Sequence, residues 1–244
     1  MLDQSDLYLI TRTDTQNLDA CVAWVKSIQD SFQKCYILND FKTSVEGKII
    51  FKKTRNPVQP SSLNVALREL PHQEKFFFLI ASREVQLTAD YISKLQKILL
   101  DDPTLLVAGC TLRVVVEGNG ELSTQLDNEL QTYYKQQGVA YVVPWNTCAM
   151  WNYELFKKNV GEFEKAFDVA EGAPKGMEDG LAIAKASSAD ATIRYKLLDD
   201  RIEWLVDKNR IDRHREKMDR KNSSLSAFMQ RLGFSEEKLR RARV

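Results

Sequence analysis

Long apolar segments are missing from this 244-residue sequence. No run approaches the ~18 consecutive apolar residues that a membrane-spanning helix needs, so we expect no transmembrane segment. The first ten residues, MLDQSDLYLI, also lack the basic start and apolar stretch of a secretory signal peptide. These absences predict a cytoplasmic protein.

Cysteine and histidine are scarce as well, with 4 and 2 residues. No two cysteines form a Cys-x-x-Cys pair, and three of them lie in apolar runs, where a reduced cysteine behaves as a small hydrophobe. We therefore expect neither a structural disulfide nor a zinc site. The cysteines are Cys21, Cys35, Cys110 and Cys148.

A strong net charge is also absent, since 35 basic residues face 34 acidic ones. The balance hides an asymmetry. Residues 207–244 carry 12 Lys and Arg against 6 Asp and Glu, a net of +6, while the preceding residues sum to −5. We expect a basic helical extension at 207–244 on a domain spanning 1–206. Nucleic-acid binding is not predicted, because acids are interspersed with the basic residues.

The first 110 residues alternate short apolar runs with helical patterns. The run at 76–80 is typical of a strand buried on both faces of a parallel sheet. This alternation predicts right-handed βαβ units. Expected strands lie at 7–10, 35–38, 49–51, 76–80 and 105–108, and expected helices at 17–28, from Ser61 and Ser62 onward, and at 91–99.

Later segments are less regular. We expect strands at 111–116, 139–143 and 191–198, and helices at 122–136, 153–160 and 176–186. A linker is expected at 207–224, then a helix capped at 222–224 and ended by Gly233, and a last helix capped by Ser235. Residues 222–244 either pack on the domain, which we favour, or dock on an anionic membrane or on a second copy.

Three segments, in this order, resemble family 2 glycosyltransferases with the GT-A fold. Residues 7–12, 36–40, 55–57 and 62–64 are similar to the donor-binding half of that family. Residues 76–91 resemble the segment in which a strand ends in Asp-x-Asp before a helix. Residues 141–156, followed by 176–180, resemble the acceptor side and its Glu-Asp pair. The resemblance implies a mostly parallel central sheet flanked by helices, with a helical C-terminal tail.

The resemblance also implies a donor site for a UDP- or GDP-sugar. Asp40 would accept hydrogen bonds from the base or ribose, although Asn-Asp is equally a common turn pair. The carboxyl ends of parallel strands share one edge, so one crevice could collect the other donor residues. These are Thr11, Arg12, Asn64, Ser82 and Arg83. Asn64 could equally be a polar residue on the exposed face of a helix.

By the same resemblance, Asp179 would be the general base of an inverting transfer, and Glu178 would orient it or the acceptor. Acids in the first turn of a helix also complement its dipole without any catalytic role. Trp145 would stack on the sugar of a glycan or glycoconjugate acceptor and Asn146 would bond its hydroxyls. A core position is the more common fate of tryptophan.

The sequence departs from the family at 81–83, where Ala81-Ser82-Arg83 replaces Asp-x-Asp. Mn²⁺ and Mg²⁺ require oxygen ligands, and Arg83 would repel a cation. The departure therefore disfavours a divalent cofactor. Either Arg83 binds the diphosphate in place of the metal, or the domain is a catalytically inactive binding or scaffolding module.

Overall fold

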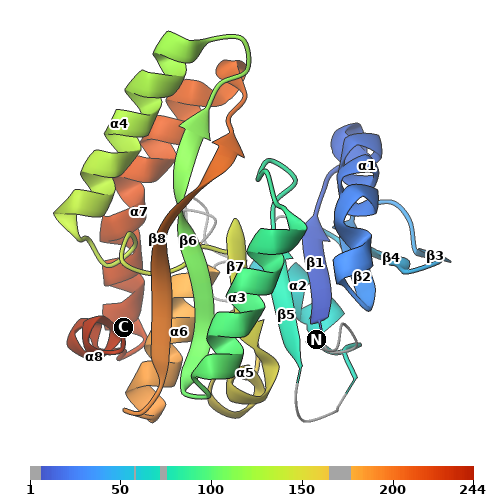
Figure 1. Cartoon of the computed structure of the whole chain (residues 1–244). Coiled ribbons are helices and arrows are strands. Elements are labelled where there is room, and N and C mark those ends of the chain that lie inside the picture. Colours follow the sequence, from blue (N-terminus) through green and yellow to red (C-terminus); the bar gives the residue numbers. More distant parts are fainter. Residues whose placement is uncertain (1–6, 58, 72–75, 165–176) are drawn as a thin grey trace.

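One mixed sheet organises the computed structural model, which describes residues 7–57, 59–71, 76–164 and 177–244. Within these residues, eight strands follow the order β3-β4-β2-β1-β5-β7-β6-β8 (Figure 1). Their bounds are β1 Leu7–Arg12, β2 Lys34–Asn39, β3 Ser44–Glu46, β4 Ile49–Lys53, β5 Phe77–Ala81, β6 Leu105–Val115, β7 Cys148–Asn152 and β8 Arg194–Leu205.

Strand direction determines which loops meet at the edge of the sheet where the parallel strands end. β4, β2, β1 and β5 are parallel neighbours, and β8 is parallel to β6. β7 is antiparallel to both β5 and β6, and its first residue, Cys148, pairs with Ala81, the last residue of β5. The segment that precedes β7 therefore lies at the edge where the parallel strands end.

Helices cover both faces of the sheet, as Figure 1 shows for α3 in front and α6 behind. The prediction of a mostly parallel sheet flanked by helices is thus confirmed. The helices are α1 Leu18–Ile28, α2 Pro60–Leu67, α3 Ala89–Asp101, α4 Gly120–Gln136, α5 Tyr153–Asn159, α6 Glu178–Ala189, α7 Ile211–Arg231 and α8 Glu236–Arg241.

The strand expected at 139–143 is wrong. These residues form turns, with the Tyr141 N–H donating to the Gly138 carbonyl at 2.8 Å, and the strand lies further on at β7. All five side chains are nevertheless buried. Their apolar character reflects burial rather than pleating, and periodicity does not separate the two in so short a run.

The linker expected at 207–224 and the helix start at 222–224 are also wrong, because α7 runs unbroken from Ile211 to Arg231. Met218, Leu225 and Met229 are buried along one side of it. That spacing fits a helix, but the many charged residues around it obscure the pattern in the sequence.

The second helix of the tail begins as predicted, with Ser235 Oγ accepting from the Lys238 N–H. α8 packs through the fully buried Leu239. Two of its cations bond carbonyls at helix ends: Lys238 Nζ reaches Ser188 O of α6 at 3.3 Å, and Arg240 Nη1 reaches Gln137 O after α4 at 2.7 Å. Cations are favourable at these ends because helix dipoles are negative there.

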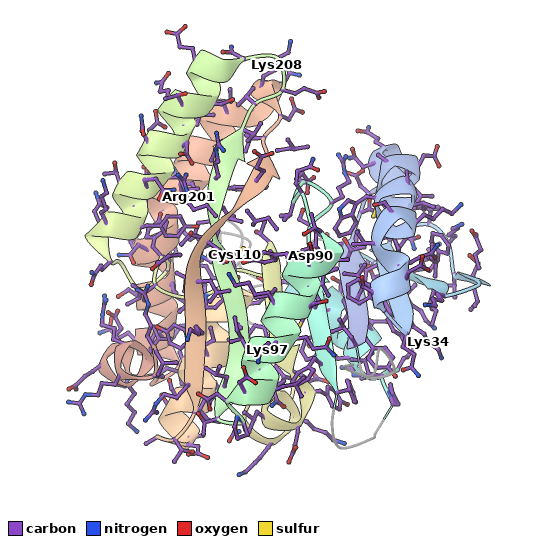
Figure 2. The ribbon with its side chains drawn as sticks, viewed as in Figure 1. Lys34, Asp90, Lys97, Cys110, Arg201 and Lys208 are labelled. Atoms are coloured by element: carbon purple, nitrogen blue, oxygen red, sulfur yellow. The ribbon has the colours of Figure 1, made fainter. Side chains whose placement is uncertain are left out.

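Charged side chains of α3 face outward, and the neighbouring strand β6 lies beneath them. Figure 2 shows Asp90 and Lys97 on the outside of α3, with Cys110 on β6 beside it. All four cysteines are buried and carry free thiols. In the part of the chain that is described, no helix is long and apolar enough to cross a membrane.

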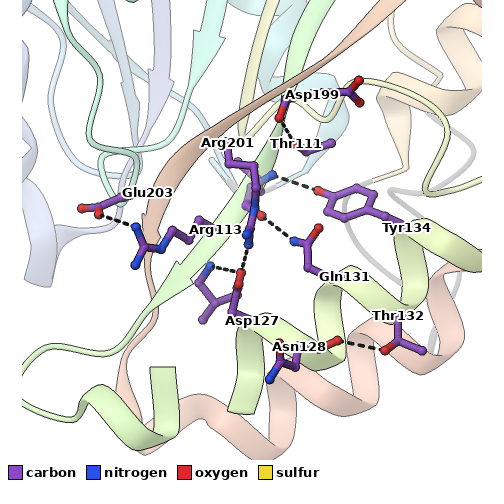
Figure 3. A network of polar contacts seen from close by, with 12 residues as sticks. Thr111, Arg113, Asp127, Asn128, Gln131, Thr132, Tyr134, Asp199, Arg201 and Glu203 are labelled. Atoms are coloured by element: carbon purple, nitrogen blue, oxygen red, sulfur yellow. Dashed lines mark hydrogen bonds and ion pairs between the residues drawn. The ribbon is translucent and has the colours of Figure 1, made fainter. Parts of the chain in front are cut away.

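The second half of β6 is bonded by the side chains of a helix. β7 pairs with β6 only over residues 107–109, so the edge beyond needs other partners for its N–H and C=O groups. α4 supplies them from one face (Figure 3). Ser123 Oγ accepts from the Val116 N–H at 2.8 Å, and Asp127 Oδ1 accepts from the Val114 N–H at 3.1 Å. At Leu112, the N–H donates to Tyr134 OH at 3.2 Å and the carbonyl accepts from Gln131 Nε2 at 3.2 Å.

The spacing of side chains along one face of α4 matches the spacing of backbone groups along β6. These hydrogen bonds can therefore repeat as a ladder between the helix and the strand. Four helical residues rise about 6 Å, and two strand residues span about 6.6 Å. Contacts at every fourth helix position therefore meet every second strand residue over this length. The ladder closes an edge that would otherwise be open to pairing with another chain.

Replacing Ser123 by Ala is expected to lower the free energy of unfolding by about 1 kcal/mol, because the buried Val116 N–H loses its acceptor. Urea denaturation measures the change. Thr124→Ala is the matched control, since the exposed Thr124 hydroxyl bonds only the Gly120 carbonyl of its own helix at 3.0 Å. Equal changes in the two variants would contradict a role for the ladder in stability.

Candidate functional site

Three predicted donor residues lie at adjacent strand ends. Arg12 ends β1, Asp40 follows β2 and Ser82 follows β5, and β1 lies between β2 and β5 in the sheet. Asp40 is exposed, and its Oδ1 accepts from Thr15 Oγ1 at 3.0 Å. These three residues therefore lie at the carboxyl edge of the sheet, where parallel strands end together.

The acidic pair of α6 reaches the same edge. Arg12 Nη2 bonds Glu178 Oε1 at 3.0 Å, and the side chain of Glu178 is 1% exposed. The ion pair joins the end of β1 to the first turn of α6, residues that are 166 positions apart. Arg12 and Glu178, which the sequence assigned to donor and catalytic roles separately, are thus in direct contact.

Asp179 is equally buried, at 2% exposure. Its Oδ2 accepts from the Asn146 backbone N–H at 2.8 Å, and its Oδ1 accepts from the Gly180 N–H at 2.7 Å. Desolvation raises the pKa of Asp179 to about 6, the negative charge of Glu178 adds to the rise, and Lys221 opposes it. A carboxyl with such a pKa is suited to exchange a proton near neutral pH.

The segment before β7 forms the wall beside Asp179. Asn146 Oδ1 accepts from Trp151 Nε1 at 3.0 Å, so this side chain is oriented by the core. Trp145 is buried and its Nε1 donates to the Ala140 carbonyl at 2.6 Å. The structure brings both predicted acceptor residues next to the acidic pair, with the Trp145 ring inside the protein. Their contact with an acceptor stays a prediction.

Sequence reasoning missed Lys221. This residue of α7 is 5% exposed, and its Nζ lies 3.3 Å from the centroid of the Trp145 ring. Lys221 follows Met218 by three positions and precedes Leu225 by four, so it interrupts the apolar side of α7. A lysine within an apolar helical stripe is the signal that could have identified it.

The segment after β5 is held by hydrogen bonds to neighbouring loops. The Ser82 N–H donates to the Thr147 carbonyl at 3.0 Å, and Ser82 Oγ donates to the carboxylate of Glu84. Arg83 Nη2 donates to Asn17 Oδ1 at 2.6 Å, and its Nε lies 3.6 Å from Glu84 Oε1. Arg83 is partly exposed, with its guanidinium at the carboxyl edge.

These residues do not fit a hard divalent ion. Ala81 offers no side-chain oxygen, Ser82 is bonded to Glu84, and the positive Arg83 lies beside that carboxylate. Among the residues that the structure describes, no three His, Cys, Asp or Glu side chains are grouped so that they could hold a metal.

Two predicted donor residues are fully buried. Thr11 lies inside the sheet, beneath the edge. Asn64 of α2 accepts from the Phe163 N–H at 2.9 Å and donates to the Phe163 carbonyl at 3.0 Å. An exposed position for Asn64 is therefore wrong. Its amide ties α2 to the segment after α5, and contact of either residue with a donor stays a prediction.

The pKa of Asp179 predicts a specific dependence of stability on pH. Its pKa is higher in the folded protein, about 6, than its ordinary value of 3.8. The resulting stabilisation is therefore fully present below about pH 4 and is lost as the pH rises to about 6. We expect it to amount to roughly 2–3 kcal/mol.

Urea denaturation at several pH values measures this effect as the difference between the unmodified protein and Asp179→Asn. Asp190→Asn is the control, because the exposed Asp190 at the other end of α6 has a lowered pKa, caused by hydrogen bonds from Thr192. A pH 4–6 slope that survives in Asp179→Asn would rule out Asp179 as its source.

Comparison with known proteins gives a structural likeness only. No protein-family model and no curated protein matches the sequence. The structure is similar to a mannosyltransferase, PcManGT from Pyrobaculum calidifontis, solved in complex with GDP-Man and Mn²⁺. The TM-score is 0.63 at 15% identity, over 97% of this chain and 68% of that one.

A cytidylyltransferase, the 2-C-methyl-D-erythritol 4-phosphate enzyme IspD from Francisella tularensis, also matches. Its TM-score is 0.34 at 13% identity, over 56% of this chain and 81% of that one. The sheet order, the flanking helices and the first likeness together show that the chain has the fold of a nucleotide-sugar transferase.

Proposed function

We propose that this protein is a glycosyltransferase of the family 2 type, moving a sugar from a UDP- or GDP-linked donor to a glycan or glycoconjugate hydroxyl. The observation that carries the proposal is the buried Glu178–Asp179 pair at the carboxyl edge, joined by Glu178 to Arg12 of β1. The likeness to an enzyme solved with GDP-Man supports a nucleotide-sugar donor.

Asp179 acts in this proposal as the general base. The acceptor oxygen forms a bond to the anomeric carbon, the bond from that carbon to the diphosphate breaks, and the acceptor proton passes to Asp179. Attack opposite the departing nucleoside diphosphate inverts the anomeric centre. The pKa of about 6 supports this role, because Asp179 is then ionised at neutral pH and still basic enough to accept a proton.

Arg83 supplies positive charge in place of a metal. Arg83 follows β5 and Arg12 ends its neighbour β1, so both cations lie where strand ends meet. A guanidinium binds phosphate oxygens through two parallel N–H groups and needs no ligands of its own. The neighbouring structure contains Mn²⁺. We propose that the altered 81–83 segment makes transfer here independent of a divalent ion.

Calorimetry with GDP-mannose and UDP-glucose, in EDTA and in Mn²⁺, tests donor binding. We expect binding of one of them in EDTA, and a roughly tenfold or greater loss in Arg83→Ala from the missing charge-assisted bonds. Arg113→Ala is the control, since Arg113 pairs with Glu203 at 3.7 Å on β6 and β8. Binding that requires Mn²⁺ would refute metal independence, and no binding of any nucleotide sugar would refute the donor site.

Transfer to a glycan acceptor tests the base. Replacing Asp179 by Asn is expected to lower kcat by roughly 10²–10⁴-fold while leaving donor affinity unchanged, because only proton transfer is removed. Radiolabelled sugar transfer measures turnover, and calorimetry measures donor affinity in the same preparation. Unchanged turnover would remove Asp179 from the mechanism.

A non-catalytic binding module is the second candidate. The burial of Asp179 and its two backbone hydrogen bonds favour it, because they also describe a structural acid in the first turn of a helix. This candidate predicts donor or glycan binding without turnover, and functions that persist in both Arg83→Ala and Asp179→Asn.

A further inference from the structure

Helix α7 packs directly on the segments that hold Asp179. Asn222 Oδ1 accepts from the Ala140 N–H at 3.2 Å, and Tyr141 OH donates to the Met218 carbonyl. At Gly180, next to Asp179, an added Cβ would lie 2.7 Å from a methyl of Leu225. A side chain at position 180 would require the Leu225 methyls to shift, so Leu225 packs closely on this glycine and α7 thereby forms one wall of the acidic site.

Lys221 lies on the same side of α7 as Met218 and Leu225, and it brings an ammonium group into this wall. Burial of a charge is unfavourable by several kcal/mol unless opposite charges or π faces compensate it. The Trp145 ring provides one such partner, with Nζ 3.3 Å from its centroid. Trp145 directly precedes Asn146, whose N–H bonds Asp179.

Among the residues that the structure describes, the groups that act on Asp179 come from three parts of the chain. Glu178 of its own helix is negative and is paired with Arg12 of β1. The backbone N–H groups of Asn146 and Gly180 donate to Asp179. Lys221 of α7 is positive and lowers the pKa of Asp179 against the rise caused by burial and by Glu178.

We propose that Lys221 is a positioning residue that keeps Asp179 ionised and in place at neutral pH, so that α7 belongs to the catalytic site. The inference rests on the proposed function, in which Asp179 accepts a proton. In this role Lys221 acts on the carboxylate of Asp179 and not on the substrate. Its cation acts through the carboxylate of Asp179, and its alkyl chain shares the apolar contacts of α7 with its neighbours.

The test compares Lys221→Met with Lys221→Arg. Methionine retains the unbranched apolar chain and removes the charge, whereas arginine retains the charge. Without the cation we expect the acid limb of the pH profile of kcat to move upward by about one pH unit, as for loss of one nearby charge. Turnover of Lys221→Met should then fall about fivefold at pH 6 and hardly change at pH 8.

Lys221→Arg should keep the pH profile of kcat of the unmodified protein. Arg220→Met is the matched control, because Arg220 is the adjacent residue, is 67% exposed in its side chain and pairs with Glu216 at 2.9 Å. A loss of kcat in Lys221→Met that is equal at all pH values would overturn the proposal, since a purely structural role predicts that pattern.

A second readout does not need activity. Titration of Asp179 makes the free energy of unfolding fall as the pH rises to about 6. In Lys221→Met this fall should continue above pH 6, and the additional fall should be absent from Lys221→Met/Asp179→Asn. If no transfer is found in the unmodified protein but the additional fall is present, the proposed function fails while the influence of Lys221 on Asp179 stands. If Lys221→Met leaves this titration unchanged, the further inference fails whatever the activity.

Discussion

An ionised carboxylate in a protein interior requires donors and cations around it, and α6 buries two carboxylates in its first turn. Arg12 of β1 compensates Glu178, and two backbone N–H groups and Lys221 serve Asp179. Apart from the Gly180 N–H of α6 itself, these partners come from the first strand, from the loop before β7 and from α7. The requirement to compensate two charges therefore ties together parts of the chain that the sheet alone would leave independent.

The antiparallel strand β7 makes this gathering geometrically possible. Because it runs against β5 and β6, the residues that precede it lie at the carboxyl edge, next to Ser82. A parallel strand in its place would put its first residues at the opposite edge. The Asn146 N–H would then be a strand length away from Asp179, and the acid would lose one of its two backbone donors.

Much of the framework was predictable from sequence, because burial and periodicity are local signals. The apolar run at 76–80 and the stripe of α3 predicted β5 and its following helix. The rule that parallel strands share a carboxyl edge predicted that Arg12, Asp40 and Ser82 would lie at one edge. Residues 139–143 were wrongly predicted as a strand, because turns buried in a core carry apolar side chains just as buried strands do. The first half of α7 was missed because its apolar positions are outnumbered by charges. Lys221 was missed with it, since its partners Trp145 and Asp179 are distant in sequence. The buried position of Asn64 likewise depends on its hydrogen bonds to the backbone of Phe163, which is distant in sequence and so leaves no local pattern.

The close packing of Leu225 on Gly180 also has a bearing on how the protein is made. The sheet strands end at Leu205, and α7 follows at Ile211, so every strand is synthesised before the helix that completes the acidic site. Until α7 docks, Asp179 lacks the Lys221 cation and its surroundings remain open to water. During translation the domain can thus assemble its sheet first and adopt the charged, enclosed form of its site as a final step.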